Sequence, residues 1–203
     1  MGFVRILAGV AFAASLTSAQ VIEFESGGLK FKTLTRNGVT IMYAHLPTQI
    51  REYSIVQVAV SNGSRIPWVI RTEDFHFEKA DGTPVNPAKP RNVVSELIGK
   101  AGRSDVIKLV STYEIGLYGL TRLQSTNGYE QRRQAAFAEL TSSKLKAAAT
   151  ASAIAFVDVK LVPGQSTDGA LFYPNQGKPL GHGKLTVKAA GETFEFPSEP
   201  HTP

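Results

Sequence analysis

The chain has 203 residues, of which 42% are hydrophobic and 19% are charged, and its formal net charge is +5. This balance excludes a disordered or collagen-like protein, and the absence of cysteine excludes disulfide scaffolds, thiol nucleophiles, iron–sulfur clusters and zinc–thiolate sites. A chain of this length buries roughly 70% of its unfolded surface, so it needs no covalent or metal cross-link to fold.

The first 19 residues have the pattern of a secretory signal peptide. Arg5 supplies a positive charge, Ile6 to Leu16 form an apolar run of 11 residues, and Thr17-Ser18-Ala19 supplies small residues before a cleavage site. An apolar run this short does not span a bilayer as a stable helix. We therefore expect a mature chain of residues 20–203, exported to the periplasm or the extracellular space, with no transmembrane span after cleavage. A retained N-terminal anchor is the alternative.

The excess of positive charge lies in the middle of the chain. Residues 91–149 contain nine basic and five acidic residues, whereas the rest of the mature chain contains 12 of each. An exported protein rarely meets nucleic acid, so we expect no nucleic-acid partner. The expected partner of this positive charge is an envelope protein or an anionic surface polymer. The alternative is a solvated helical surface of mixed charge.

Alternating apolar residues predict antiparallel strands on both sides of this middle segment. In the first part, Asn37-Gly38 suits a tight hairpin turn that needs positive φ. After the middle segment, strands are predicted at Ala153–Leu161 and Asp168–Tyr173, followed by a final hairpin. In that hairpin, Leu185 and Val187 are expected to pair with Phe194 and Phe196. The residues expected to meet in one core are Val56, Val58, Val60, Phe75, Phe77, Val157, Val159, Leu161, Phe194 and Phe196.

Residues 91–150 change to a helical period and are predicted to be a helical insertion. One apolar stripe recurs at i, i+3, i+4 and i+7 from Val94 to Ala101 and includes Ile98. Ser104-Asp105 is suited to cap a second helix. Asn127 and Glu130 have the spacing of a capping box before an alanine-rich stretch.

Two segments resemble the secreted immunoglobulin-like domains of bacteria. They are VQVAVSNGSRIPWVIRTEDFHFEKADGTPV at residues 56–85 and LVPGQSTDGALFY at residues 161–173. The resemblance implies a single immunoglobulin-like antiparallel β-sandwich over residues 20–203, here with an α-helical insertion at residues 91–150. The family implies no single activity.

Asp74, His76 and Glu78 alternate along a predicted strand and so are candidate metal ligands on one face. Successive side chains on that face lie about 6.6–7 Å apart, which strains a site shared by one ion. A solvated outer face is therefore the competing interpretation. Gly181-His182-Gly183-Lys184 is predicted to be a loop before the last hairpin, because no helix follows it to bind phosphate.

The predicted helices also carry candidate binding residues. Aromatic and basic side chains there are suited to a partner protein or an anionic surface. They are Tyr113, Tyr118, Arg122, Arg132 and Arg133. In the competing interpretation, the apolar face of residues 106–123 covers the sandwich and the arginines face water.

These patterns favour an exported, non-enzymatic binding or accessory module of the cell envelope or periplasm, with no cofactor. The first alternative is a metal-assisted hydrolase centred on Asp74, His76 and Glu78. The second is a structural component of the envelope.

Overall fold

The computed structural model describes residues 20–120, 127–139 and 141–197. The predicted signal peptide therefore lies outside the described residues. No helix in the described ranges is long and apolar enough to cross a membrane.

A five-stranded antiparallel sheet forms the middle of the molecule, with strand order β1-β2-β3-β4-β9. Its strands are β1 (Ile22–Ser26), β2 (Leu29–Arg36), β3 (Val39–Ile50), β4 (Tyr53–Asn62) and β9 (Ser166–Pro174). The hairpin between β2 and β3 turns at Asn37-Gly38, where both residues have positive φ, as the sequence predicts.

A four-stranded antiparallel sheet faces the first one, with strand order β11-β10-β6-β7. Its strands are β6 (Phe75–Lys79), β7 (Pro84–Val85), β10 (Gly183–Ala189) and β11 (Glu192–Phe196). The predicted last hairpin is confirmed, because Leu185 pairs with Phe196 and Val187 with Phe194. A separate pair joins β5 (Trp68–Ile70) to β8 (Val159–Leu161), and the short 3-10 helix η1 (Thr72–Asp74) precedes β6.

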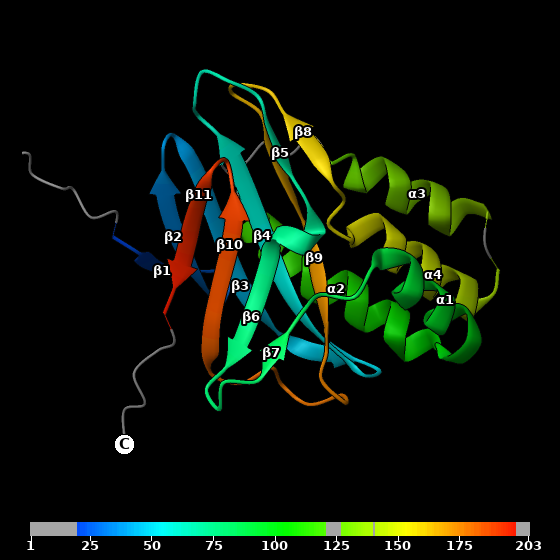
Figure 1. Ribbon diagram of the computed structural model, residues 1–203. Helices are drawn as coiled ribbons and strands as arrows, with labels where there is room; N and C mark the ends of the chain where they lie inside the picture. The colour runs from blue at the N-terminus through cyan, green and yellow to red at the C-terminus, as the bar shows by residue number, and fades with distance from the viewer. Residues whose placement is uncertain (1–19, 121–126, 140, 198–203) are drawn as a thin grey trace, which may run out of the picture.

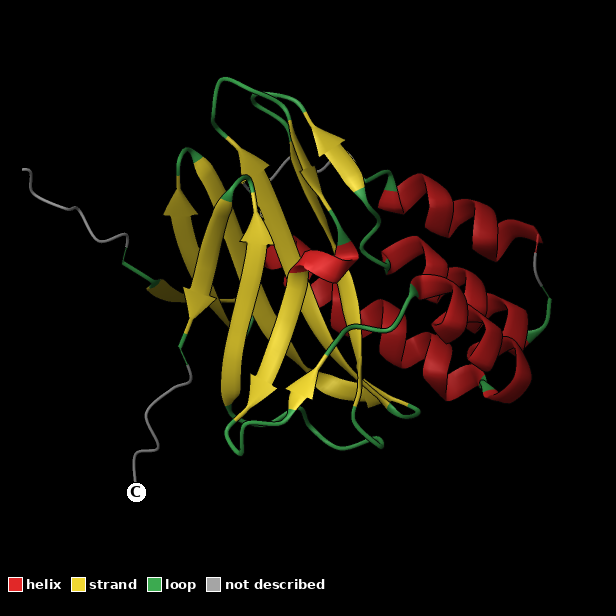
Figure 2. Cartoon of the chain, in the orientation of Figure 1, coloured by secondary structure: helices red, strands yellow, loops and turns green. Residues whose placement is uncertain are grey.

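Four α-helices lie on one side of the strands (Figure 1, Figure 2). They are α1 (Pro90–Lys100), α2 (Arg103–Gly119), α3 (Tyr129–Glu139) and α4 (Ser143–Ile154). The expectation of antiparallel sheets combined with a helical segment between strand halves is thus confirmed.

Two hydrophobic cores flank the five-stranded sheet. One core lies between the two sheets and includes Val56, Val58 and Val60 of β4 with Phe75 and Phe77 of β6. The other lies between the opposite face of the five-stranded sheet and the helices, and includes Val93, Leu97, Leu109, Ala147 and Phe172. Nearly every residue of β4 is buried, because its two faces contact different layers. The apolar face of α2 therefore covers the sheet, as the competing interpretation of residues 106–123 predicts.

The return from helices to strands differs from the prediction. Ala153 and Ile154 end helix α4, and only Val159–Leu161 form a strand in this region. Val157 is 43% exposed, so its assignment to the core is wrong. In α1, Val93 and Leu97 are buried, whereas Ile98 is 46% exposed. The face of the helix that contacts the core is therefore rotated by about one residue relative to the predicted stripe.

Helix α2 lies very close to the sheet at Gly116. A Cβ atom at this position would lie 1.6 Å from Oε1 and 2.7 Å from Cδ of Gln57 on β4. Gln57 is fully buried, and neither atom of its amide has a hydrogen-bond partner in the described structure. Gly116 therefore allows the helix to pack directly over a polar side chain that the sheet buries.

We predict that Gly116→Ala lowers the free energy of unfolding by about 1–3 kcal/mol, because overpacking outweighs the better helix propensity of alanine. Gly99→Ala in α1 is the control: a Cβ there meets nothing within 4 Å, so this change should be neutral or stabilising. In the double variant Gly116→Ala/Gln57→Ala the clashing side-chain atoms are absent, so part of the lost free energy of unfolding should be recovered. Additive losses in the double variant, measured by urea unfolding, would contradict the assigned contact.

Candidate functional site

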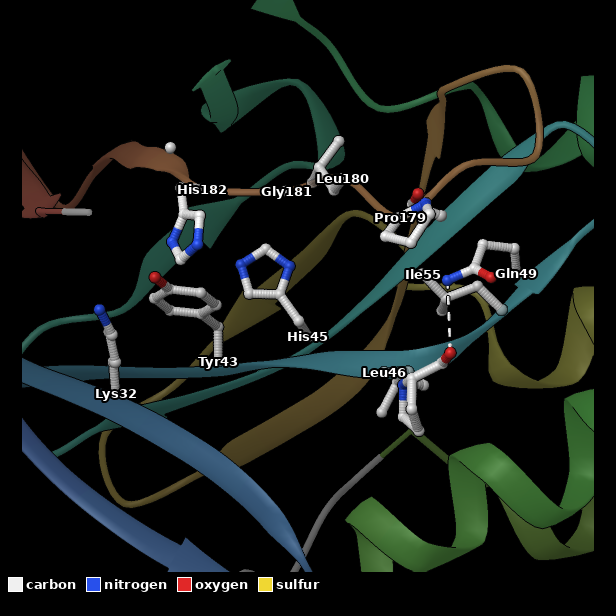
Figure 3. A pocket seen from close by; sticks show the side chains of 13 residues that line it. Lys32, Tyr43, His45, Leu46, Gln49, Ile55, Pro179, Leu180, Gly181 and His182 are labelled. Carbon is white, nitrogen blue, oxygen red and sulfur yellow. Dashed lines mark hydrogen bonds between the residues drawn. The ribbon is translucent and has the colours of Figure 1, made fainter. Parts of the chain in front are cut away.

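A cavity of about 360 Å³ lies where β3, the start of β4 and the loop between β9 and β10 meet. Its lining combines polar and apolar side chains from segments far apart in the sequence (Figure 3). The lining residues are Lys32, Tyr43, His45, Leu46, Pro47, Gln49, Ser54, Ile55, Pro179, Leu180, Gly181, His182 and Gly183.

Strand alternation places three of the polar side chains on the face that looks toward the second sheet. Val39, Ile41 and Tyr43 of β3 belong to the core between the sheets, and His45 follows on the same face. Lys32 of β2 pairs with Tyr43 and lies beside it. The apolar interior between the sheets thus changes to polar side chains at this end.

The fourth polar side chain, His182, comes from the loop before β10. The backbone oxygen of His182 accepts a hydrogen bond from the N–H of Ala80 at 3.0 Å. The Ser54 hydroxyl donates to the backbone oxygen of Lys178 at 2.6 Å and holds the loop to β4. Gly183 permits this arrangement, because a Cβ there would lie 2.3 Å from the backbone oxygen of Glu78. The loop is therefore fixed to both sheets.

Aromatic contacts hold the side chains on β3. The rings of Tyr43 and His45 pack edge to face with centroids 5.6 Å apart, and His45 packs against Phe77 at 5.7 Å. Tyr43 also packs edge to face against Phe196 at 5.0 Å. Figure 3 shows the rings of His45, Tyr43 and His182 grouped together, with the amino group of Lys32 beside them. The group is therefore positioned before any ligand arrives.

Lys32 is the most buried charged group of the cavity, with a side chain 10% exposed. Its ammonium lies 3.2 Å from Oε1 of Glu23, which is 56% exposed, and donates to the backbone oxygen of Pro197 at 3.1 Å. An ammonium has three N–H donors, and these contacts use two of them. No other residue that the structure describes is recorded as a partner of the third donor.

The residues that line the cavity include no aspartate or glutamate. A lysine supplies positive charge instead, and two histidines and a tyrosine hydroxyl supply N–H and O–H groups. Chemically, this end of the cavity is suited to an acceptor-rich group.

Of the predicted binding residues on the helices, the structure describes the side chains of Tyr113, Arg132 and Arg133, and none of these three is fully exposed. Tyr113 is fully buried, and its hydroxyl donates to the buried carboxylate of Asp168. Burial, together with the Asp168 carboxylate, raises the pKa of Tyr113 well above its usual range, so the phenol stays protonated as a donor. Tyr113 is therefore a core residue. The side chain of Tyr118 and the whole of Arg122 lie outside the described residues.

Arg132 and Arg133 are half-buried and contact neighbouring helices. Nη1 of Arg132 donates to the backbone oxygen of Ser152 at 3.4 Å. Nε of Arg133 lies 3.3 Å from Oε1 of Glu114, and its guanidinium lies over the ring of Tyr129 at 5.8 Å. Both arginines thus contribute to the packing of the helical layer.

The three candidate metal ligands are also not grouped. Asp74 belongs to η1, not to the strand, and its carboxylate accepts a hydrogen bond from the N–H of Arg71 at 2.7 Å. Burial raises the pKa of Asp74 despite that hydrogen bond. His76 is exposed, with Nδ1 2.8 Å from Oδ1 of Asn86, and Glu78 is exposed on β6. In the described ranges, no three His, Asp or Glu side chains are arranged to hold a metal.

Sequence reasoning did not select the cavity residues. His45 was detectable, because it continues the inward-facing alternation Val39, Ile41, Tyr43. His182 was not, since only the folded loop brings it to β3. Comparison of the chain with family models, curated proteins and solved structures gave no match. The function is therefore argued from the site alone.

We predict that Lys32→Met leaves the free energy of unfolding within about 1 kcal/mol of wild type or raises it. The ion pair with an exposed glutamate contributes little, and the methionine removes a buried charge. Lys30→Met, an exposed change on the same strand, is the control. A loss of several kcal/mol for Lys32→Met in chemical denaturation would assign Lys32 a structural role instead.

Proposed function

We propose that this protein is an exported, non-enzymatic binding module that takes a small ligand in the cavity. The observation that carries the proposal is the convergence of Lys32, Tyr43, His45 and His182 on one cavity from three separate segments. Its volume of about 360 Å³ lies at the lower end of the range of small-molecule sites. A preformed group of donors at the end of two packed sheets is suited to ligand recognition, because little conformational entropy is lost when a ligand binds to it.

The architecture supports an immunoglobulin-like sandwich as the frame of this module. Two antiparallel sheets face each other across one core, and the chain crosses between them several times. The helical segment enters between β7 and β8. We propose that the fold is a sandwich of this kind with residues 91–150 inserted.

The periplasm or the extracellular space is the proposed location, on the basis of residues 1–19. The helical layer adds a second surface, with exposed cations at Lys100, Arg103, Lys108 and Lys144. This charge supports the proposal that the module docks on an envelope protein or an anionic surface polymer. Metal-assisted hydrolysis at Asp74, His76 and Glu78 has no support from their arrangement.

Point substitutions test this proposal better than deletion of the helices, since deletion would expose the sheet face that they bury. The variants are His45→Ala and His182→Ala, and the control is His76→Ala, an exposed histidine that does not line the cavity. The probe is the small-molecule fraction of an envelope extract from the native host.

The extract should raise the melting temperature of the wild type and of His76→Ala, because a ligand that binds only the folded state stabilises it. The two cavity variants should show a smaller shift or none. Equal shifts in all four proteins, or no shift in any, would contradict a ligand site in this cavity.

A further inference from the structure

We propose that the ligand of the cavity is a small organic anion with an apolar body. Its carboxylate or phosphate would lie among Lys32, His45 and His182, and its apolar part along Pro179 and Leu180. This inference rests on the proposed function, because it assigns a chemical class to the ligand of the same site.

The charged end follows from the lining. A lysine ammonium and two imidazoles face the cavity, and the residues that line it include no carboxylate. Glu23 pairs with Lys32 from a largely exposed position, and this pair and the Pro197 carbonyl together take two of the three ammonium donors. Hydrogen bonds from a charged donor to an anionic oxygen are about twice as strong as those between neutral groups. An oxyanion therefore gains more from this end than a neutral acceptor does.

The position of Lys32 in the fold also favours an anionic ligand. It lies on the sheet face whose neighbouring positions Leu34, Ile41 and Val58 are buried in the core between the sheets. A buried ammonium costs free energy unless it is paired, and its one ionic partner is mostly in solvent. An anion in the cavity would complete the pairing from the inner side. The same charge opposes a divalent cation bound by the two histidines.

The apolar end follows from the remaining lining residues. The side chains of Leu46 and Ile55 belong to the core on the helix side of the sheet. Figure 3 shows Pro179 and Leu180 on the side away from Lys32 and Tyr43. These residues offer carbon surface and no charge. A ligand that carries its charge at one end therefore fits the cavity better than an inorganic anion, which would leave this surface without contacts.

The test uses the protein without residues 1–19 and four probes with the same six-carbon chain. Hexanoate and hexyl phosphate carry the anion, hexanol is neutral, and hexylamine is cationic. Calorimetric titration should show at least one of the two anions binding about tenfold or more tightly than hexanol, with hexylamine weaker still. The two anions also distinguish a carboxylate ligand from a phosphate ligand. Inorganic phosphate should bind more weakly than hexyl phosphate if the apolar end contributes.

Variants locate the binding. Lys32→Met and His45→Ala should each weaken the tighter anion about tenfold, and His76→Ala should leave its affinity unchanged. The Lys32→Met variant should fold, because the Glu23 carboxylate that loses its partner is 56% exposed and stays hydrated.

Two results would overturn the assignment in different ways. If hexylamine or hexanol binds in place of the anions and His45→Ala abolishes that binding, the anion chemistry is wrong and the binding module remains. If no probe binds, the assignment of a small organic anion fails, and the extract experiment decides separately whether the cavity takes any ligand.

Discussion

Strands β4 and β9 of the five-stranded sheet are buried on both faces, and the rest of the structure depends on this constraint. Val56, Val58 and Val60 of β4 face the second sheet, while Ile55 and Ala59 face the helices. Nearly every residue of β4 and β9 is therefore buried, including the polar side chains of Gln57 and Asp168. It also means that neither the second sheet nor the helices can be removed without exposing a large apolar face, which costs about 25 cal/mol for each Å². The helical segment is thus part of the hydrophobic structure rather than a separate attachment.

Polar groups interrupt this apolar structure at two places, with different consequences. On the helix side, Tyr113 and Asn127 donate to the carboxylate of Asp168, so that buried charge is satisfied. At the end of the inter-sheet space, Lys32 and His45 stand on the inward face and line a cavity. The hydrogen bonds to Asp168 hold helix α2 against the sheet. Lys32 and His45 instead line the cavity of the proposed ligand site.

Much of the antiparallel strand pairing was predictable, because local signals and long-range pairing agree there. The Asn37-Gly38 turn and the pairing of Leu185 with Phe196 depend on residues close in sequence. The boundary near residue 154 was not predictable in this way. The run from Ala153 to Leu161 alternates like a strand, yet α1 and α2 provide an apolar surface that extends α4 to Ile154. The tertiary context overrides the local pattern at that point.

The candidate site was harder to predict for a similar reason. Its histidines are separated by more than a hundred residues, and the hydrogen bond from Ala80 to the His182 backbone forms only when the two sheets face each other. Tyr113 was selected as a candidate binding residue because it is aromatic and lies in a basic helical segment. In the structure it is buried in the core. A pattern of residue types indicates which face of a helix is apolar, and the partner of that face is decided by the rest of the fold.

Native-state hydrogen exchange tests the doubly buried sheet most directly. If the three layers form one cooperative structure, the slowest amides of α1, α2 and α4 will open with the same free energy as those of β3 and β4, within about 1 kcal/mol. Exchange of the helical amides at a free energy several kcal/mol lower, with β3 and β4 still protected, would contradict the account. It would show that the sheet is stable with its helix-facing side uncovered.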